Sequence, residues 1–352
     1  MCESKNLRSR KYFAAANSYN GFVSLFDKVF KSEDFNRIYL LKGGPGTGKS
    51  SLMKKIASHL KDKRCDVDEI YCSSDPKSLD GVVAKNGDKK IAIIDGTAPH
   101  ERDAKIPGAI DEIIDLASGF DLPWITSRRK DILEINEEKK NAYKTAYSYL
   151  RIAGSAYNFI ADGYQSNFNI NEAKIKAEEI LSSIPSSKAP SHEEYFISSF
   201  GRYGRYKIDE NETTQGHTIR VYGDEYSSEI FIDLIHQYAL LKSLSFDSFL
   251  SPFTPSFCEG MYFPDAKMTL IKSDFGEIDA TRFLKNDKLH TERIRRAKEM
   301  RKEALEEAER WFAIASDLHF KLEEIYGVAM DFSNNDAIFD KKIKEIENIL
   351  QI

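Results

Sequence analysis

A glycine-rich segment near the amino terminus places the strongest constraint on the fold of this chain. Residues 43–50 read Gly-Gly-Pro-Gly-Thr-Gly-Lys-Ser and match the pattern G-x-x-x-x-G-K-[ST] at every fixed position. The apolar residues 38–41 before them are typical of a buried parallel strand. Residues 51–60 after them carry apolar side chains at helical spacing. Strand, glycine loop and helix therefore follow one another in the order of a phosphate-binding loop.

Each residue type in this loop has a physical reason to be there. Glycines let backbone N–H groups turn inward around phosphates without a Cβ clash, and the following helix adds the positive end of its dipole. We expect Lys49 to reach the β- and γ-phosphates and the Ser50 hydroxyl to bind Mg²⁺. The predicted ligands are a nucleoside triphosphate, written here as ATP, and Mg²⁺. The predicted binding residues are Gly43, Gly44, Pro45, Gly46, Thr47, Gly48, Lys49, Ser50 and Ser51.

An acidic residue at the end of a predicted strand supports the interpretation of the glycine loop. Strands are predicted at residues 67–72 and 91–94, and the latter ends in Asp95. An apolar strand that ends in an acid is the form in which a metal-binding aspartate accompanies a phosphate loop, so Ser50 and Asp95 are the predicted Mg²⁺ ligands. Gly96 follows Asp95, where many hydrolytic ATPases carry a glutamate. This favours kinase-like or switch-like proteins over motor ATPases and leaves the residue that activates water open.

Three further residues are candidates for that catalytic role. Asp75 follows the second predicted strand, at the sheet edge where ligands bind in open α/β folds; the alternative is a turn residue before a proline. His100 and Glu101 follow the loop after Asp95, where a solvated or structural role is the alternative. Residues 108–117 carry apolar side chains at a spacing that predicts a helix for packing alone.

Arg128 opens the next predicted helix, together with two further basic residues. In kinase-like proteins a helical lid supplies arginines that neutralise charge on the transferring phosphoryl group, which makes Arg128 a catalytic candidate. The alternative is a solvated helix start. Other basic residues are mixed with acids or are few in number, so we do not expect nucleic acid as a partner.

The second half of the chain repeats the layout of the first at an offset of 179 residues. Gly44 coincides with Gly223, Asp68 with Asp247, and apolar positions follow the same order. The loop of the second copy has lost its lysine and gained three acids, Asp224, Glu225 and Glu229. Because acids repel a triphosphate, we expect no nucleotide site in the second half.

Helical segments follow the predicted sheet of each half. Small apolar residues recur every 3.5 positions from Ala142 to Ile160 and again from Ala304 to Leu318, a spacing that predicts antiparallel helices with a close seam. The predicted fold is α/β: a P-loop NTPase-like parallel sheet, duplicated, with a helical hairpin on each half. The predicted domains are residues 1–184 and 195–352, joined by a Ser- and Pro-rich linker at 185–194.

The sequence resembles a known family at this level of detail. The loop at 43–51, Ser73-Ser74-Asp75-Pro76 and Asp95-Gly96-Thr97-Ala98-Pro99-His100 are similar to segments of bacterial P-loop ATPases with two tandem P-loop-like halves. The resemblance implies ATP binding through residues 43–50. Members commonly carry a phosphate loop in the second half as well, and this sequence departs from that pattern.

Composition bounds the remaining choices. A chain of 352 residues accommodates two domains of about 100–200 residues each. The net charge of −5 argues against a nucleic-acid coat protein, and four scattered cysteines suit neither a disulfide scaffold nor a zinc site. No apolar run reaches the ~18 residues of a membrane span, and residues 1–11 are too polar for a signal peptide. We therefore expect a cytoplasmic protein without membrane contact.

These observations predict an ATP-binding protein that acts through its first half. Phosphoryl transfer to water would make it an ATPase, and transfer to an unidentified acceptor would make it a transferase. One alternative is an ATP-gated interaction module with slow hydrolysis and a protein partner. Another is a small-molecule or nucleotide kinase.

Overall fold

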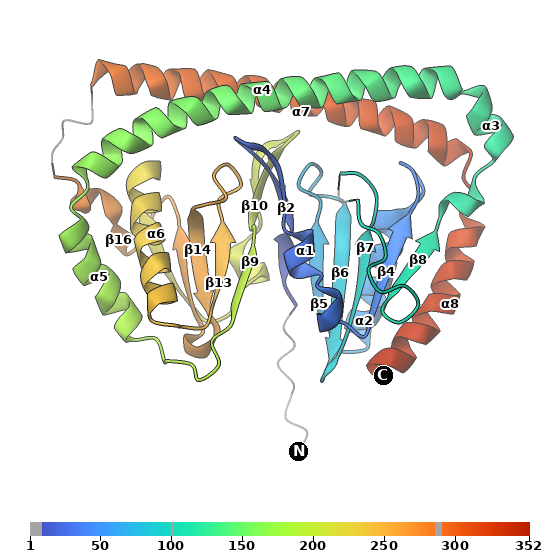
Figure 1. The fold of residues 1–352 in the computed structure, drawn as a ribbon, viewed down its shortest axis with the longest axis horizontal. Helices are drawn as coiled ribbons and strands as arrows, with labels where there is room; N and C mark the ends of the chain where they lie inside the picture. Colours follow the sequence, from blue (N-terminus) through green and yellow to red (C-terminus); the bar gives the residue numbers. More distant parts are fainter. Residues whose placement is uncertain (1–8, 100, 286–290) are drawn as a thin grey trace.

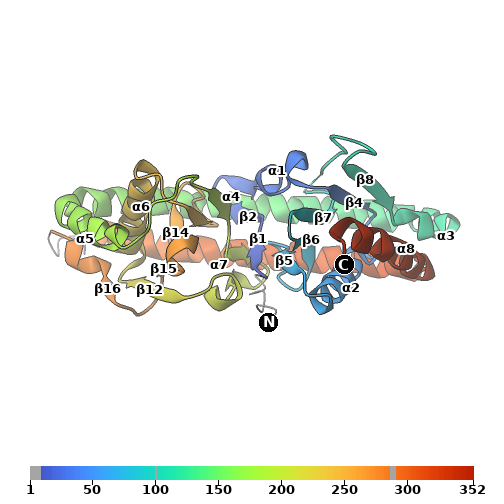
Figure 2. The same cartoon turned by 90° about the horizontal axis from the view of Figure 1, so that it is seen from below.

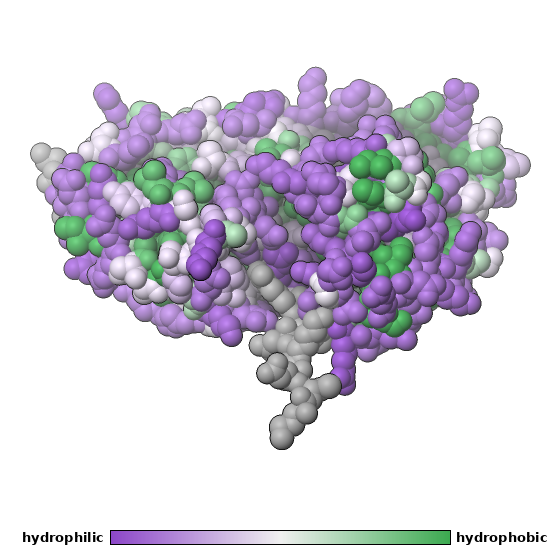
Figure 3. Space-filling model, turned by 60° about the horizontal axis from the view of Figure 1, so that its bottom comes forward, coloured by the Kyte–Doolittle hydropathy of each residue, from purple (hydrophilic) through white to green (hydrophobic). Residues whose placement is uncertain are grey.

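The computed structural model describes residues 9–99, 101–285 and 291–352. Two six-stranded mixed sheets lie side by side, and two long helices cross both of them (Figure 1). The molecule is elongated along these helices, as the orthogonal view shows (Figure 2). The visible face in Figure 3 is mostly hydrophilic, with apolar residues in small separate patches. Among the described residues, no helix has both the length and the apolar composition that crossing a membrane requires.

The first sheet contains the strands predicted around the glycine loop. The predictions at 38–41, 67–72 and 91–94 are confirmed as β4, β5 and β7, and β4 pairs in parallel with β7 and β8. The sheet is mixed and not wholly parallel, because β6 runs antiparallel between β5 and β7. Its strands, in spatial order, are β1 (Lys11–Phe13), β5 (Asp66–Tyr71), β6 (Leu79–Asn86), β7 (Lys89–Asp95), β4 (Arg37–Lys42) and β8 (Asp111–Asp115).

The helix predicted at 108–117 is wrong, because residues 111–115 of that segment form the edge strand β8. Its backbone pairs with β4 from Ile38 to Lys42. Ile114 is buried while Ile113 is half exposed, as expected for side chains that alternate across an edge strand. Closely spaced isoleucines are compatible with a short helix as well as with a strand. The segment forms a strand because its backbone can pair with the otherwise unpaired edge of β4.

The second sheet has the same strand order as the first. Its parallel pair β12–β15 corresponds to β4–β7, and its antiparallel strand β14 corresponds to β6. This correspondence, element by element, is compatible with a duplicated α/β fold. The strands, in spatial order, are β9 (His192–Tyr195), β13 (Phe246–Leu250), β14 (Cys258–Phe263), β15 (Met268–Lys272), β12 (His217–Tyr222) and β16 (Ile278–Asp279).

The two sheets meet along their edge strands. The N–H and carbonyl groups of Phe13, at the end of β1, exchange hydrogen bonds with those of Phe196 just after β9, at 2.8 and 2.9 Å. Below this contact, the Arg10 guanidinium bonds to Asp68 of β5 and to Glu193 of β9. Apolar side chains of both sheets then share one core, which includes Ile38, Leu40, Tyr195, Phe249 and Ile271.

The two long helices lie side by side and run antiparallel across both sheets (Figures 1 and 2). They are α4 (Arg129–Asn167) and α7 (Glu292–Val328). The alanine spacing correctly predicted a close helix seam: Ala146 and Ala153 of α4 are fully buried in one cluster with Ala308 of α7. The predicted hairpins within each half differ from what is observed, since α4 pairs with the long helix of the other half.

The helix after each long helix covers the opposite sheet. Helix α5 (Ile170–Ser182) shares a core with α6 (Glu225–Leu241) of the second sheet. Helix α8 (Ser333–Leu350) shares a core with α2 (Lys49–Asp62) of the first. Each long helix therefore starts over one sheet, and the helix that follows it in the chain packs on the other sheet.

Smaller elements connect these layers. Two β-hairpins lie where the sheets meet, and short helices occupy several loops (Figure 1). The hairpins are β2 (Ala15–Ser18) with β3 (Gly21–Ser24), and β10 (Ser198–Gly201) with β11 (Gly204–Lys207); the helices are α1 (Phe26–Val29), α3 (Leu122–Ser127) and the 3-10 turns Ser32–Asp34, Ala117–Gly119, Glu210–Glu212, Pro264–Ala266 and Ala280–Phe283.

Candidate functional site

The glycine loop connects the end of β4 to the start of α2, as its sequence predicts. Gly46 has a φ of +71°, and Gly48, which caps α2, has a φ of +81°. Residues with a Cβ avoid this left-handed backbone, so glycine is required at both positions if the loop is to turn into the helix. The consequence is a loop of backbone N–H groups that leads directly into a helix N-terminus.

Lys49 is the first residue of α2, and its ammonium group lies back over the loop. Its Nζ donates hydrogen bonds to the carbonyl oxygens of Gly43 and Gly44, at 3.0 and 2.9 Å. The same Nζ lies 3.7 Å from Oδ2 of Asp95. Strand β7 makes this contact possible, because it is the direct neighbour of β4 and places Asp95 opposite Leu41.

Asp95 lies in a polar but desolvated position. Its Oδ1 accepts a hydrogen bond from the Thr97 N–H at 2.9 Å and another from the Thr97 hydroxyl. Burial raises the pKa of Asp95 above its usual range, although the Lys49 charge and the Thr97 hydrogen bonds act in the opposite direction. The positively charged neighbour favours the carboxylate form that a metal ion needs.

Ser50 is held by a neighbouring strand. Its Oγ accepts a hydrogen bond from the N–H of Leu79, the first residue of β6, at 2.9 Å. Ser50 and Asp95 are oxygen donors on two elements that both meet the glycine loop, and oxygen donors are the chemistry that Mg²⁺ prefers. These residues fit a Mg²⁺ ion whose remaining ligands come from phosphate and water.

Asp80 is a buried carboxylate that the sequence reasoning missed. It follows Leu79 on β6 and is 7% exposed. Its negative charge is close enough to raise the pKa of Asp95. The signal in the sequence is an isolated acid within the apolar run 79–84, although the antiparallel strand that carries it was not predicted.

The other predicted residues have different surroundings. Asp75 accepts hydrogen bonds from the Lys77 N–H and the Ser78 hydroxyl, which is the turn role weighed as its alternative. Arg128 precedes α4 and pairs with Asp131 of that helix, 3.0 Å apart, with both side chains about half exposed. The catalytic roles of Asp75 and Arg128 therefore stay predictions. Ser51 and Glu101 are exposed, and His100 lies outside the described residues.

Residues from the end of α7 and the start of α8 contact the glycine loop. A Cβ at Gly46 would lie 2.5 Å from the carbonyl oxygen of Glu323. The Asn335 side-chain amide of α8 donates a hydrogen bond to the Thr47 carbonyl oxygen at 2.8 Å. The candidate site thus contains residues from both ends of the chain, which the sequence reasoning did not anticipate.

The corresponding place in the second half has the opposite arrangement of charges. Lys272 lies opposite Val221 of β12 in the position that Asp95 has opposite Leu41. Glu225 is the first residue of α6, as Lys49 is of α2, and its Oε1 lies 3.9 Å from the Lys272 Nζ. The cation and the anion of the first site have therefore exchanged places.

The N-terminus of α6 also carries its own anion. Oδ1 of Asp224 accepts hydrogen bonds from the N–H groups of Tyr226 and Ser227, each at 3.0 Å. This carboxylate occupies the position in which a helix N-terminus would bind a phosphate.

Comparisons of the chain with protein-family models, with curated proteins and with solved structures found no match.

Proposed function

We propose that the protein binds Mg-ATP at the glycine loop of its first half and transfers the γ-phosphoryl group to water or to an acceptor. The observation that carries this proposal is the convergence of Lys49, Ser50 and Asp95 on one glycine loop at the carboxyl edge of a sheet. The Lys49–Asp95 separation of 3.7 Å supports it, since both groups are required at the same phosphates.

The residues of the chain have separate tasks in this proposal. The loop N–H groups and the α2 N-terminus hold the phosphates, and the Lys49 ammonium exchanges the Gly43 and Gly44 carbonyls for phosphate oxygens. Ser50 and Asp95 hold Mg²⁺, which when bound neutralises charge on the phosphates. Asp80 adds a buried carboxylate beside them that is suited to orienting a water molecule.

Replacement of the loop lysine tests the proposal. Lys49→Ala is expected to lower Mg-ATP-dependent phosphate release by about 100-fold or more, because it removes the cation at the transferring group. Lys54→Ala is the matched control, since Lys54 is an exposed lysine of the same helix that bonds to the Lys77 carbonyl. Wild-type protein without calorimetric affinity for Mg-ATP would contradict the proposal.

The cover over the loop favours a second function, an ATP-gated interaction module. Helix α7 touches Gly46 at one end and begins over the second sheet at the other, so phosphate binding at the loop acts on a helix that spans both halves. Limited proteolysis around the junction of α7 and α8 is expected to change when Mg-ATP is added. An unchanged cleavage pattern in protein that demonstrably binds ATP would contradict gating.

A further inference from the structure

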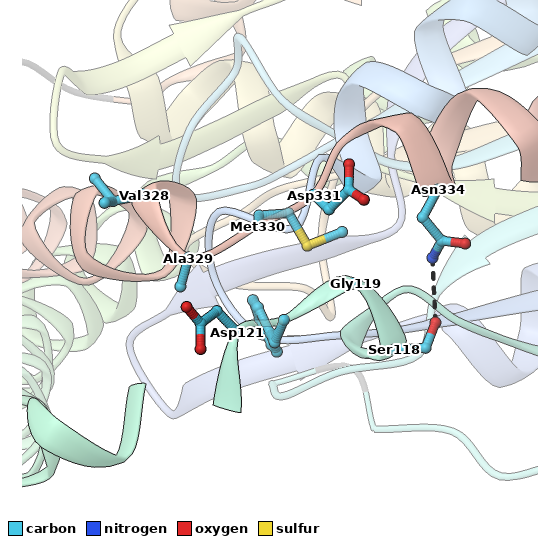
Figure 4. A pocket seen from close by; sticks show the side chains of 9 residues that line it. Ser118, Gly119, Asp121, Val328, Ala329, Met330, Asp331 and Asn334 are labelled. Atoms are coloured by element: carbon cyan, nitrogen blue, oxygen red, sulfur yellow. Dashed lines mark hydrogen bonds between the residues drawn. The ribbon is translucent and has the colours of Figure 1, made fainter. Parts of the chain in front are cut away.

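A hollow of about 550 Å³ lies beside the glycine loop, between segments from opposite ends of the sequence (Figure 4). One wall is the segment after β8, and the other is the junction of α7 and α8. Two backbone hydrogen bonds hold the walls together: the Asp121 N–H donates to the Ala329 carbonyl, and the Asp331 N–H donates to the Gly119 carbonyl. Backbone hydrogen bonds therefore fix the position of the two walls relative to each other.

The hollow adjoins the candidate phosphate site. Phe120 lines it, and the ring of this residue reaches the loop, 3.6 Å from a Cβ placed on Gly44. Asn334 lines it as well, and the next residue, Asn335, bonds to the Thr47 carbonyl of the loop. A molecule whose phosphates occupy the loop can thus extend into this space.

The chemistry of the walls suits an uncharged ring that bears an amino group. Val328 and Met330 provide apolar contact, while Asp121 and Asp331 come from opposite walls (Figure 4). The two carboxylates disfavour phosphate. Oδ1 of Asp121 caps α3, and Oδ1 of Asp331 accepts hydrogen bonds from the N–H and hydroxyl of Ser333. In the described part of the chain no hydrogen bond engages Oδ2 of either. Both Oδ2 atoms are available to accept a hydrogen bond from an amino group.

We propose that this hollow binds the adenine base of the nucleotide whose phosphates occupy the glycine loop. The inference rests on the proposed function and adds the place and the chemistry of base recognition. The base lies between a loop of the first sheet and the end of the helix that begins over the second sheet. A bound nucleotide therefore joins the two ends of the sequence.

Blocking the hollow while the loop stays intact tests the proposal. Val328 is 75% exposed and lies at one end of the hollow, and Ser118 is exposed at the other (Figure 4). Val328→Trp and Ser118→Trp therefore fill the space from two sides without disturbing the core. Leu241→Trp is the matched control, because Leu241 is 80% exposed at the end of α6 in the second half.

The readout is calorimetric affinity for Mg-ATP and for Mg-tripolyphosphate, which has no base. Both blocking variants are expected to weaken ATP binding about tenfold or more, equivalent to about 1.4 kcal/mol, and to leave tripolyphosphate binding within about twofold of wild type. Leu241→Trp is expected to change neither. Asp331→Asn keeps the oxygen that accepts from Ser333 and is expected to weaken ATP binding relative to tripolyphosphate.

The outcomes separate this inference from the function on which it rests. ATP affinity that stays at the wild-type level in both blocking variants overturns base binding in the hollow and leaves the phosphate site standing. Equal loss of ATP and tripolyphosphate binding also overturns it, because the substitutions then act through the loop. Wild-type protein that binds neither compound overturns the proposed function itself.

Discussion

Replacing Gly46 by alanine measures how closely helix α7 approaches the glycine loop. Gly46 combines a left-handed backbone, with φ at +71°, and a backbone neighbour on the far end of α7. An added methyl group would lie 2.5 Å from the Glu323 carbonyl oxygen and 3.1 Å from the Gly327 nitrogen. Because both neighbours are backbone atoms of one helix, the loop or the whole helix end must move.

The expected cost has two parts. The left-handed conformation costs an alanine roughly 1–2 kcal/mol. Forcing a methyl group into a packed contact adds typically about 1–3 kcal/mol. Gly87→Ala is the matched control, since Gly87 also has a left-handed backbone, with φ at +62°, but nothing lies within 4 Å of its added Cβ. Gly46→Ala is therefore expected to lower the free energy of unfolding by at least about 1 kcal/mol more than Gly87→Ala.

Urea unfolding followed by circular dichroism gives both free energies, provided that the transition has a single step in each variant. Equal destabilisation by Gly46→Ala and Gly87→Ala would refute the close approach of α7, because the backbone term alone would then explain both. Nucleotide binding by Gly46→Ala protein adds a second readout, since a displaced loop is expected to bind tripolyphosphate more weakly.

Two further substitutions test the charged groups of the second half. Glu225→Gln removes the carboxylate that pairs with Arg301 and that lies 3.9 Å from Lys272, while Lys272 keeps its nearer partner Glu229. The substitution is expected to cost about 2–3 kcal/mol in urea unfolding, at or below the low end of the range for buried pairs, because the Glu225 side chain is 27% exposed. Although burial acts in the opposite direction, Lys272 and Arg301 lower the pKa of Glu225 to about 2. The stability that the pairing contributes is therefore present above pH 4.5 and is lost as the pH falls toward 2. A difference in the free energy of unfolding between wild type and variant that does not narrow over this range would contradict the pairing. Burial lowers the pKa of both His192 and His236 below 6.5, so the unfolded chain binds protons more readily and stability is lost as the pH falls below 6.5. His236→Phe is expected to reduce the fall in urea midpoint between about pH 7.5 and 5.5. An identical fall in variant and wild type would speak against a half-buried neutral histidine at this position.

The parts of the fold that the sequence predicted are those with local signals. The strand at 38–41, the loop glycines and helix α2 follow from residues adjacent in the chain, so their order and geometry could be predicted together. The position of Asp95 at the end of β7 could be predicted because a strand that ends in an acid is also a local pattern. The layout of the second sheet followed from its similarity in sequence to the first.

The parts that were missed depend on contacts between distant residues. The alanine period of α4 indicates a narrow apolar face, but α5 and α7 both offer such a face, and the period does not say which one packs there. The edge strand β8 depends in the same way on the free side of β4. The cover of the glycine loop by α7 and Asn335 has no sequence signal near the loop, since about 290 residues separate Asn335 from Thr47.

The exchange of terminal helices limits how this chain can change over evolutionary time. Ile343, Ile346 and Leu350 of α8 belong to the same core as Leu52 and Ile56 behind the glycine loop. A truncation before α7 would therefore expose the apolar face of the half that carries the complete loop. The charges at the start of α6 can therefore change more freely than the length of the second half and its helices, which the core of the first half requires.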